Sequence, residues 1–217
     1  MTLQGELFSG APLDTLSFEK TAYRHGFTCV AGIDEAGRGP LAGPVMAAAV
    51  ILPAGLSIIG VDDSKKLTPD KREKLFETIM AHALTVGVGI MSPVEIDRIN
   101  ILQATRRAMV AAVQQLSPQP DYLLIDGISA IDSAIPQKTI KKGDSLSLSI
   151  AAASIIAKVT RDRLMVEMDS TYPGYGFAGH KGYGSAAHMD AIRRLGPSPI
   201  HRLTFGGVKE YVDCIFS

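Results

Sequence analysis

Four acidic residues stand where an apolar run or a loop gives way to glycine or to a helix: Asp34, Glu35, Asp126 and Asp144. A carboxylate at the end of an apolar strand is poorly solvated and needs a partner, and ligands of open α/β sheets gather at such strand ends. Converging carboxylates repel one another unless a divalent cation lies between them, and oxygen ligands alone favour Mg²⁺ or Mn²⁺ over zinc. The pattern therefore predicts a metal site suited to phosphoryl transfer, in which paired ions activate water and stabilise the leaving oxygen.

Each acid also has a purely structural interpretation. Asp126 before Gly127 is typical of a turn, Asp144 is placed to cap a helix, and Asp34 with Glu35 could form a solvated strand end. Neighbouring strand residues point to opposite faces of a sheet. Asp34 and Glu35 can therefore share a metal only if the chain bends between them or a main-chain carbonyl takes part.

The composition excludes several classes of protein. The 217 residues carry 22 basic and 22 acidic side chains, which excludes a generically basic nucleic-acid binder but allows a local basic face. Cys29 and Cys214 form neither a disulfide framework nor a metal spacing, so a reducing compartment is expected. No secretory signal is expected, and no apolar stretch approaches the roughly 20 residues of a membrane helix. We expect a soluble, cytoplasmic protein with no membrane contact.

The apolar patterning predicts a mixed α/β sheet covered by helices. Strands are expected at residues 28–34, 45–52, 85–92 and 121–127, with a weaker one at 138–144. Helices are expected at residues 16–27, from Pro69 with Thr68 as its cap, at 100–116 and at 147–165. The last is apolar nearly all round in its first half, which predicts burial at the centre of the protein. Residues 1–15 are expected to be loose, and 16–217 to form one domain with a helical C-terminal part from about residue 171.

Six segments resemble the bacterial ribonuclease HII family, the type 2 ribonucleases H: VAGIDEAGRGPLAGPV, DDSKKLTPDKRE, EIDRINILQATRRAM, LLIDG, KGDSLSLSIAAASIIAKVTRD and YPGYGFAGHKGYGS. Their order and spacing match across about residues 28–205. The resemblance implies a ribonuclease H-like fold, with a five-stranded mixed sheet flanked by helices and a small C-terminal helical extension. It also implies cleavage on the 5′ side of a ribonucleotide within duplex DNA, and cleavage of RNA–DNA hybrids, leaving a 3′-hydroxyl and a 5′-phosphate.

The resemblance assigns roles to residues of this sequence. The catalytic acids that bind Mg²⁺ or Mn²⁺, with two ions expected in the active complex, are Asp34, Glu35, Asp126 and Asp144. The motif that contacts the ribonucleotide around its 2′-hydroxyl is Gly37, Arg38 and Gly39, although an ordinary turn is the alternative from the residues alone. Tyr183 matches the tyrosine that stacks on the sugar 3′ to the ribonucleotide. Because only the 2′-hydroxyl distinguishes RNA from DNA, we expect the glycines to let main-chain groups approach it, where a β-carbon would obstruct them.

Basic residues within the matching segments are candidates for phosphate contacts. We expect this role for Lys65, Lys158 and Arg161, of which the last two share one face of a helix; a merely solvated face is the alternative. The segment HRLTF at residues 201–205 departs from the family, which more often has a second arginine followed by serine. No phosphate contact is predicted there.

A short N-terminal segment suggests a protein partner. QGELF, which begins at Gln4, resembles peptides bound by the bacterial sliding clamp, and Leu7 and Phe8 would enter an apolar pocket of that partner. The alternative is that these two side chains cover the edge of the core. Two other functions also stay open: a different nuclease of the same fold, such as a junction resolvase or a hybrid-only ribonuclease H, and a non-catalytic nucleic-acid-binding module. We expect a monomer that takes part in removing ribonucleotides from DNA.

Overall fold

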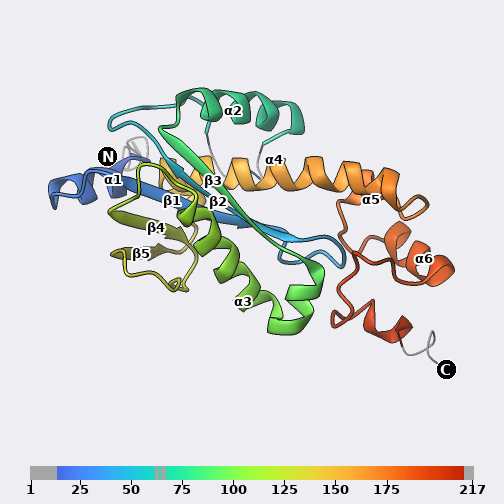
Figure 1. The fold of residues 1–217 in the computed structure, drawn as a ribbon. Helices are drawn as coiled ribbons and strands as arrows, with labels where there is room; N and C mark the ends of the chain where they lie inside the picture. Colours follow the sequence, from blue (N-terminus) through green and yellow to red (C-terminus); the bar gives the residue numbers. More distant parts are fainter. Residues whose placement is uncertain (1–13, 62–63, 65–66, 213–217) are drawn as a thin grey trace, which may run out of the picture.

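The structure, a computed structural model, describes residues 14–61, 64 and 67–212 (Figure 1). At its centre lies a five-stranded sheet in the order β3-β2-β1-β4-β5. Its strands are β1 (Val30–Ala36), β2 (Val45–Ile51), β3 (Thr85–Met91), β4 (Tyr122–Asp126) and β5 (Gln137–Ile140). β2 pairs antiparallel with both β1 and β3, whereas β4 pairs parallel with both β1 and β5. The predicted mixed sheet is confirmed.

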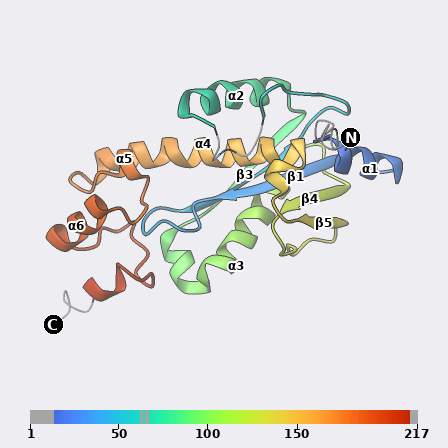
Figure 2. The ribbon, with the colours of Figure 1, turned by 180° about the vertical axis from the view of Figure 1, so that it is seen from behind.

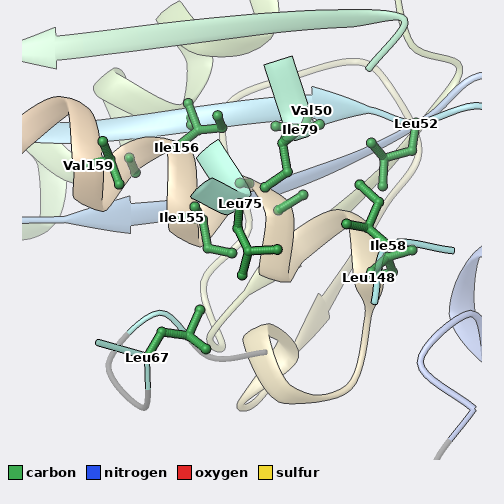
Figure 3. Packing of buried hydrophobic residues seen from close by; sticks show 14 of the residues in the cluster. Val50, Leu52, Ile58, Leu67, Leu75, Ile79, Leu148, Ile155, Ile156 and Val159 are labelled. Carbon is green, nitrogen blue, oxygen red and sulfur yellow. The ribbon is translucent and has the colours of Figure 1, made fainter. Parts of the chain in front are cut away.

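Helices cover both faces of this sheet. α2 (Pro69–His82) and α4 (Leu148–Thr171) lie on one face and α3 (Pro93–Gln114) on the other, as Figure 1 and the opposite view in Figure 2 show. Residues 148–157 of α4 are all buried, which confirms the predicted central helix. Ile155 and Ile156 pack there with Leu75 and Ile79 of α2 and with Val50 of β2 (Figure 3). Aliphatic side chains from three elements thus hold α4 in place.

α3 begins earlier than its apolar spacing indicates. It starts at Pro93, where Ser92 and Glu95 form a reciprocal capping box. Asn100 has φ 66° and ψ 163°, so the helical geometry is interrupted there and resumes afterwards. The expected start at residue 100 is therefore wrong, because the cap and the proline specify the first turn independently of the apolar stripe.

β5 is also shorter than the expected strand at 138–144. It ends at Ile140, and Lys142 adopts a left-handed conformation with φ 58°. A 3₁₀ helix, η2 (Gly143–Ser145), follows directly and contains Asp144. The side chain that caps α4 belongs to Ser147, not to Asp144, so the capping alternative for Asp144 is excluded.

The C-terminal part contains α5 (Phe177–His180), α6 (Ala186–Leu195) and the 3₁₀ helix η3 (Lys209–Tyr211). It lies beyond the end of the sheet at which the loop of residues 37–44 leaves β1 (Figure 1). The Leu41 amide donates to the Gly182 carbonyl, and Ala42 forms a β-bridge with His201. The expected helical C-terminal extension is present, and it is joined to the loop between β1 and β2.

The short helix α1 (Ser17–Arg24) lies at the opposite end of the sheet (Figure 1). Its buried Glu19 accepts hydrogen bonds from the hydroxyl groups of Ser147 and Ser149 at 2.6 and 2.7 Å. A carboxylate is favourable at this place, because the N-terminus of α4 carries partial positive charge. No helix among the described residues is long and apolar enough to cross a membrane.

A single glycine of β1 sets the distance between the sheet and α4. A β-carbon on Gly32 would lie 2.1 Å from the main-chain carbon of Ser149, a separation that side-chain rearrangement cannot relieve. Gly32 therefore allows the N-terminal turn of α4, and η2 in front of it, to approach β1 closely.

We predict that Gly32→Ala destabilises the protein by about 1–3 kcal/mol or more, since the added methyl group meets main-chain atoms. Gly206→Ala is the matched control, because Gly206 is exposed and its β-carbon would contact nothing within 4 Å; we expect a change within about 0.5 kcal/mol. Urea unfolding of both variants measures the difference. Equal midpoints for the two variants would show that the close approach is unimportant.

Candidate active site

Asp34 and Asp126 lie side by side at one edge of the sheet. β1 and β4 run parallel with Ile33 opposite Ile125, so the next residue of each strand is one of the two acids. Asp34 is 3% exposed, and its Oδ1 accepts the Glu35 amide at 2.7 Å. The predicted gathering of these two carboxylates at a strand end is confirmed.

Asp126 also connects this edge to the segment that carries Asp144. Its Oδ1 accepts the Gly143 amide at 2.6 Å, and Asp144, the next residue, is 6% exposed. Gly127 has φ 95°, and the chain bends there, but the Asp126 carboxylate bonds to Gly143 and not to the residues that directly follow it. One carboxylate oxygen of Asp126 thus holds η2 in place beside the acidic edge.

The acids repel one another in the metal-free protein. Burial is the main cause that raises the pKa of Asp34 well above its ordinary value of 3.8, and the negative charges of Glu35 and Asp126 raise it further. Among the residues that the structure describes, no group of three His, Cys, Asp or Glu side chains is arranged to hold a metal ion. The donor set at this edge is nevertheless all-oxygen and lacks a compensating cation at Asp34, which fits a hard divalent ion.

Glu35 points away from Asp34, as the alternation along a strand requires. Asp34 is on the face of β1 that Gly32 presents to α4, whereas Glu35 follows Ile33 on the opposite face. Its carboxylate forms an ion pair with Arg38, Oε1 to NH1, at 3.2 Å. Arg38, which stands between two glycines, thus lies next to the acids as the ion-pair partner of Glu35.

Two buried arginines hold the loop of residues 37–44 by its carbonyl oxygens. Arg202 donates to the carbonyls of Gly37, Arg38 and Gly43. Arg161 donates to those of Ala42, Pro44 and Lys181 at 3.0–3.1 Å. Both side chains are 0% exposed, and neither forms an ion pair with a carboxylate of the described chain.

This geometry contradicts the predicted phosphate contact of Arg161. Residues 158 and 161 are close on α4, but the Arg161 guanidinium faces inward and its donors are occupied by main-chain carbonyls. The spacing could not show this, because it indicates which residues share a face of the helix and not what that face packs against. Arg202 was not predicted as functional at all, and only its position after buried His201 hints at burial.

The glycines on either side of Arg38 differ in what they permit. Gly37 has φ 92°, and a β-carbon there would lie 2.1 Å from Nε of Arg161. Glycine is therefore needed at position 37 to make room for the buried arginine, whether or not a substrate is bound. The nearest atom to a β-carbon on Gly39 is Cε1 of Tyr183, at 3.8 Å. Of the two glycines, only Gly39 is placed so that an added β-carbon would point toward the surface near Tyr183, where it could obstruct a substrate.

Tyr183 and Gly39, which are 144 positions apart in the chain, thus lie next to each other on the surface. The tyrosine ring is 46% exposed, and the Lys158 ammonium lies 5.9 Å from its centre. Lys158 also pairs with Asp162 at 2.7 Å. The phosphate contact of Lys158 remains a prediction. Lys65, for which the same contact is predicted, lies outside the described residues.

We predict that Asp34→Asn stabilises the metal-free protein at pH 8. A carboxyl group whose pKa is raised in the folded state contributes stability that is lost as pH rises from about 3.8 through the folded pKa. Asparagine cannot ionise, so the variant does not lose this stability as pH rises, and its side-chain oxygen still accepts the Glu35 amide. Because about 1 kcal/mol shifts Tm by roughly 2–4 °C in a domain of this size, we expect a gain of several degrees in EDTA.

The gain should shrink toward pH 4, where the wild-type carboxyl is protonated in the folded state and the unfolded chain is close to its ordinary pKa of 3.8. Asp132→Asn, at an exposed position, serves as control and should change Tm by little at either pH. A pH-independent gain for Asp34→Asn would contradict the repulsion.

Comparison with known proteins agrees with this architecture. A family model described as Ribonuclease HII matches residues 31–208. The ribonuclease HII of Pelobacter propionicus is 68% identical over 211 residues, which cover 97% of this chain and 96% of that protein. The crystal structure of ribonuclease H2 from Pyrococcus horikoshii OT3 matches with a TM-score of 0.73 and 29% identity, over 88% of this chain and 100% of that one.

A chain of the PCNA:ribonuclease HII complex from Archaeoglobus fulgidus matches with a TM-score of 0.70 and 25% identity, over 82% of this chain and 96% of that one. The five-stranded mixed sheet with flanking helices is therefore the ribonuclease H-like fold. On the family model and the identity to curated relatives, the chain belongs to the ribonuclease HII family.

Proposed function

We propose that this chain cleaves the phosphodiester on the 5′ side of a ribonucleotide embedded in duplex DNA and cuts the RNA strand of RNA–DNA hybrids. The products would carry a 3′-hydroxyl and a 5′-phosphate, and the role would be ribonucleotide removal from cellular DNA in the cytoplasm. Its family makes the chain an endoribonuclease of the ribonuclease H type. The observation that carries the narrower proposal is the exposed Tyr183 ring beside Gly39.

The loop of residues 37–44 offers main-chain donors to the substrate. Arg202 binds the carbonyl oxygens of Gly37 and Arg38, and in a trans peptide the C=O and the following N–H point in opposite directions. The amides of Arg38 and Gly39 therefore point away from the guanidinium, and neither donates to an acceptor within the described residues. Two such donors beside an exposed aromatic ring suit a ribose: the amides bind the 2′-hydroxyl, and the ring stacks on the next sugar.

Asp34, Asp126 and Asp144 would hold Mg²⁺ or Mn²⁺ through their carboxylates, as two ions in the active complex. Glu35, whose carboxylate lies on the other face of β1, would join them through its main-chain carbonyl or after a bend between it and Asp34. When bound, these ions supply an activated water and stabilise the leaving oxygen. Asp34 provides a buried carboxylate that needs a cation, and Asp126 positions η2 and with it Asp144. Lys158, near Tyr183, would contact a phosphate and position the duplex without reading its sequence.

We predict that Asp126→Asn lowers cleavage of a duplex with one embedded ribonucleotide by roughly 100-fold or more, since charge at the scissile phosphate is left unsupported. Asparagine keeps an oxygen for the Gly143 amide, so the fold and duplex binding should survive. The assay compares wild type and variant with Mg²⁺, with Mn²⁺ and with EDTA, and identifies the product ends. Asp132→Asn should cleave like wild type.

The same assay separates the alternatives. Activity on long RNA–DNA hybrids without activity on the single-ribonucleotide duplex would indicate a hybrid-only ribonuclease H. Cleavage of branched DNA instead would indicate a resolvase. Unchanged function of Asp126→Asn would indicate a binding module.

We further propose a monomer that contacts a sliding clamp through QGELF at residues 4–8. This segment lies outside the described residues, and the proposal is supported by its sequence and by the solved complex of an archaeal relative with PCNA. We predict that replacing Leu7 and Phe8 by alanine abolishes retention on immobilised clamp, because apolar anchors supply the affinity of such peptides. Cleavage activity should be unchanged, and equal retention of the variant would disprove the contact.

A further inference from the structure

Three histidines gather behind Tyr183 and take no part in the chemistry described above. His188 of α6 and His201 are 0% and 2% exposed, and their Nε2 atoms lie 3.0 Å apart. The ring of His180, at the end of α5, stacks on that of His188 with centres 4.3 Å apart. Phe177 closes the cluster, packing edge-on against His180 and His188.

The hydrogen bonds determine which nitrogen of each ring carries the proton. The Ser198 amide can only donate, and it points at Nδ1 of His201 at 2.8 Å; the His201 proton is therefore on Nε2. That N–H donates to Nε2 of His188, whose own proton must then be on Nδ1. Nδ1 of His188 lies 2.9 Å from the Tyr183 carbonyl, which can only accept. Each group in this series donates to the next, from the Ser198 amide through His201 and His188 to the Tyr183 carbonyl.

His180 secures the other side of Tyr183 by the same logic. The Gly182 amide donates to its Nδ1 at 3.1 Å, and its Nε2 lies 2.8 Å from the Tyr175 carbonyl. The His180 proton is therefore on Nε2. The Tyr183 carbonyl and the amide of the preceding residue, Gly182, thus each bond to a neutral imidazole.

We propose that His180, His188 and His201 form a neutral hydrogen-bond relay of positioning residues, which holds the Tyr183 ring against Gly39 for substrate recognition. The proposal rests on the role proposed above for Tyr183. A proton added to Nε2 of His188 would face the N–H of His201, and one added to Nδ1 of His180 would face the Gly182 amide. The relay therefore operates only while all three rings are uncharged.

The surroundings favour that neutral state. The charged side chains on the packed elements include the cationic Arg161, Lys181 and Arg202, and Asp190, which is exposed on α6 and pairs with Arg193 and Arg194. Helix α4, which packs on α5, also carries the acids Asp162, Glu167 and Asp169, and Asp162 pairs with Lys158. No described carboxylate hydrogen-bonds to a relay histidine. Burial lowers the pKa of His188, and burial together with the neighbouring His188 lowers the pKa of His201 to about 4.

The first test reads the tautomers directly. Long-range ¹⁵N–¹H spectra of the uniformly labelled full-length protein at pH 7 distinguish a proton on Nδ1 from one on Nε2, and single His→Gln variants assign the signals. We expect Nδ1–H for His188, the less common form in water, and Nε2–H for His180 and His201. A charged His188, or one protonated on Nε2, would overturn the relay whatever the substrate.

The second test asks whether the relay acts through Tyr183. His188→Asn keeps an N–H near the position of Nδ1, whereas His188→Gln places its amide near Nε2 and loses the donor to Tyr183. We expect His188→Gln to lower kcat/KM on the single-ribonucleotide duplex by roughly 10-fold or more, and His188→Asn to restore much of this. In a Tyr183→Ala background, His188→Gln should lower kcat/KM by less than about 2-fold, because the effects of two coupled residues do not add.

Controls separate the possible outcomes. His82→Gln, at an exposed position of α2, should leave kcat/KM unchanged, and circular dichroism verifies that each variant is folded. An equal loss for His188→Gln with and without Tyr183 would show a merely structural role and overturn the proposal. If Tyr183→Ala itself had no effect, the proposed substrate contact would fail, while the tautomer spectra would still test the relay.

Discussion

Two buried guanidinium groups, which have no carboxylate partner among the residues that the structure describes, hold the loop of residues 37–44 against the C-terminal part of the chain. Arg161 and Arg202 are fully buried, and burial lowers the pKa of both, that of Arg202 to about 9. Removing a cation from water costs several kcal/mol, and charge-assisted hydrogen bonds to carbonyl oxygens offset that cost here. Because most of those carbonyls belong to the loop of residues 37–44, any opening of the loop would leave a buried charge uncompensated. The loop is therefore constrained on its inner side and presents its amides outward.

At the acidic edge, by contrast, the buried charge of Asp34 is left without a compensating cation among the described residues. There the protein gathers negative charge and does not compensate it at Asp34, whose pKa is raised by burial and by its neighbours. Glycine at position 32 lets α4 approach β1, and the bond from Gly143 to Asp126 places η2 beside the strand ends. The site is strained electrostatically without a cation, while its backbone is held in place by the sheet and by α4. Such an arrangement suits an enzyme whose charge balance is completed only by ions and substrate.

These two regions are connected by the C-terminal part of the chain. It provides Arg202, the three histidines and Tyr183, and it joins the loop through the Leu41–Gly182 bond and the bridge between Ala42 and His201. The proposed contacts to the sugar and the proposed chemistry at the phosphate would thus draw on distant parts of the sequence. The helical extension supplies Tyr183 and, through Arg202, holds the loop of residues 37–44 in place, so it is an integral part of the fold.

Local patterns in the sequence were sufficient for much of this structure. Alternating apolar runs predicted the strands, the all-round apolar stretch predicted the buried α4, and acids at strand ends predicted the acidic edge, because each depends on neighbours in the chain. The apolar stripe did not indicate the start of α3, because the capping box of Ser92 and Glu95 specifies the first turn. What only the tertiary structure decided is the direction of side chains. Arg161 turned inward to carbonyls that lie more than a hundred residues away in sequence, and the histidine tautomers follow from partners across three segments. Spacing along one helix carries no information about such partners, because they are brought together only when the whole chain has packed.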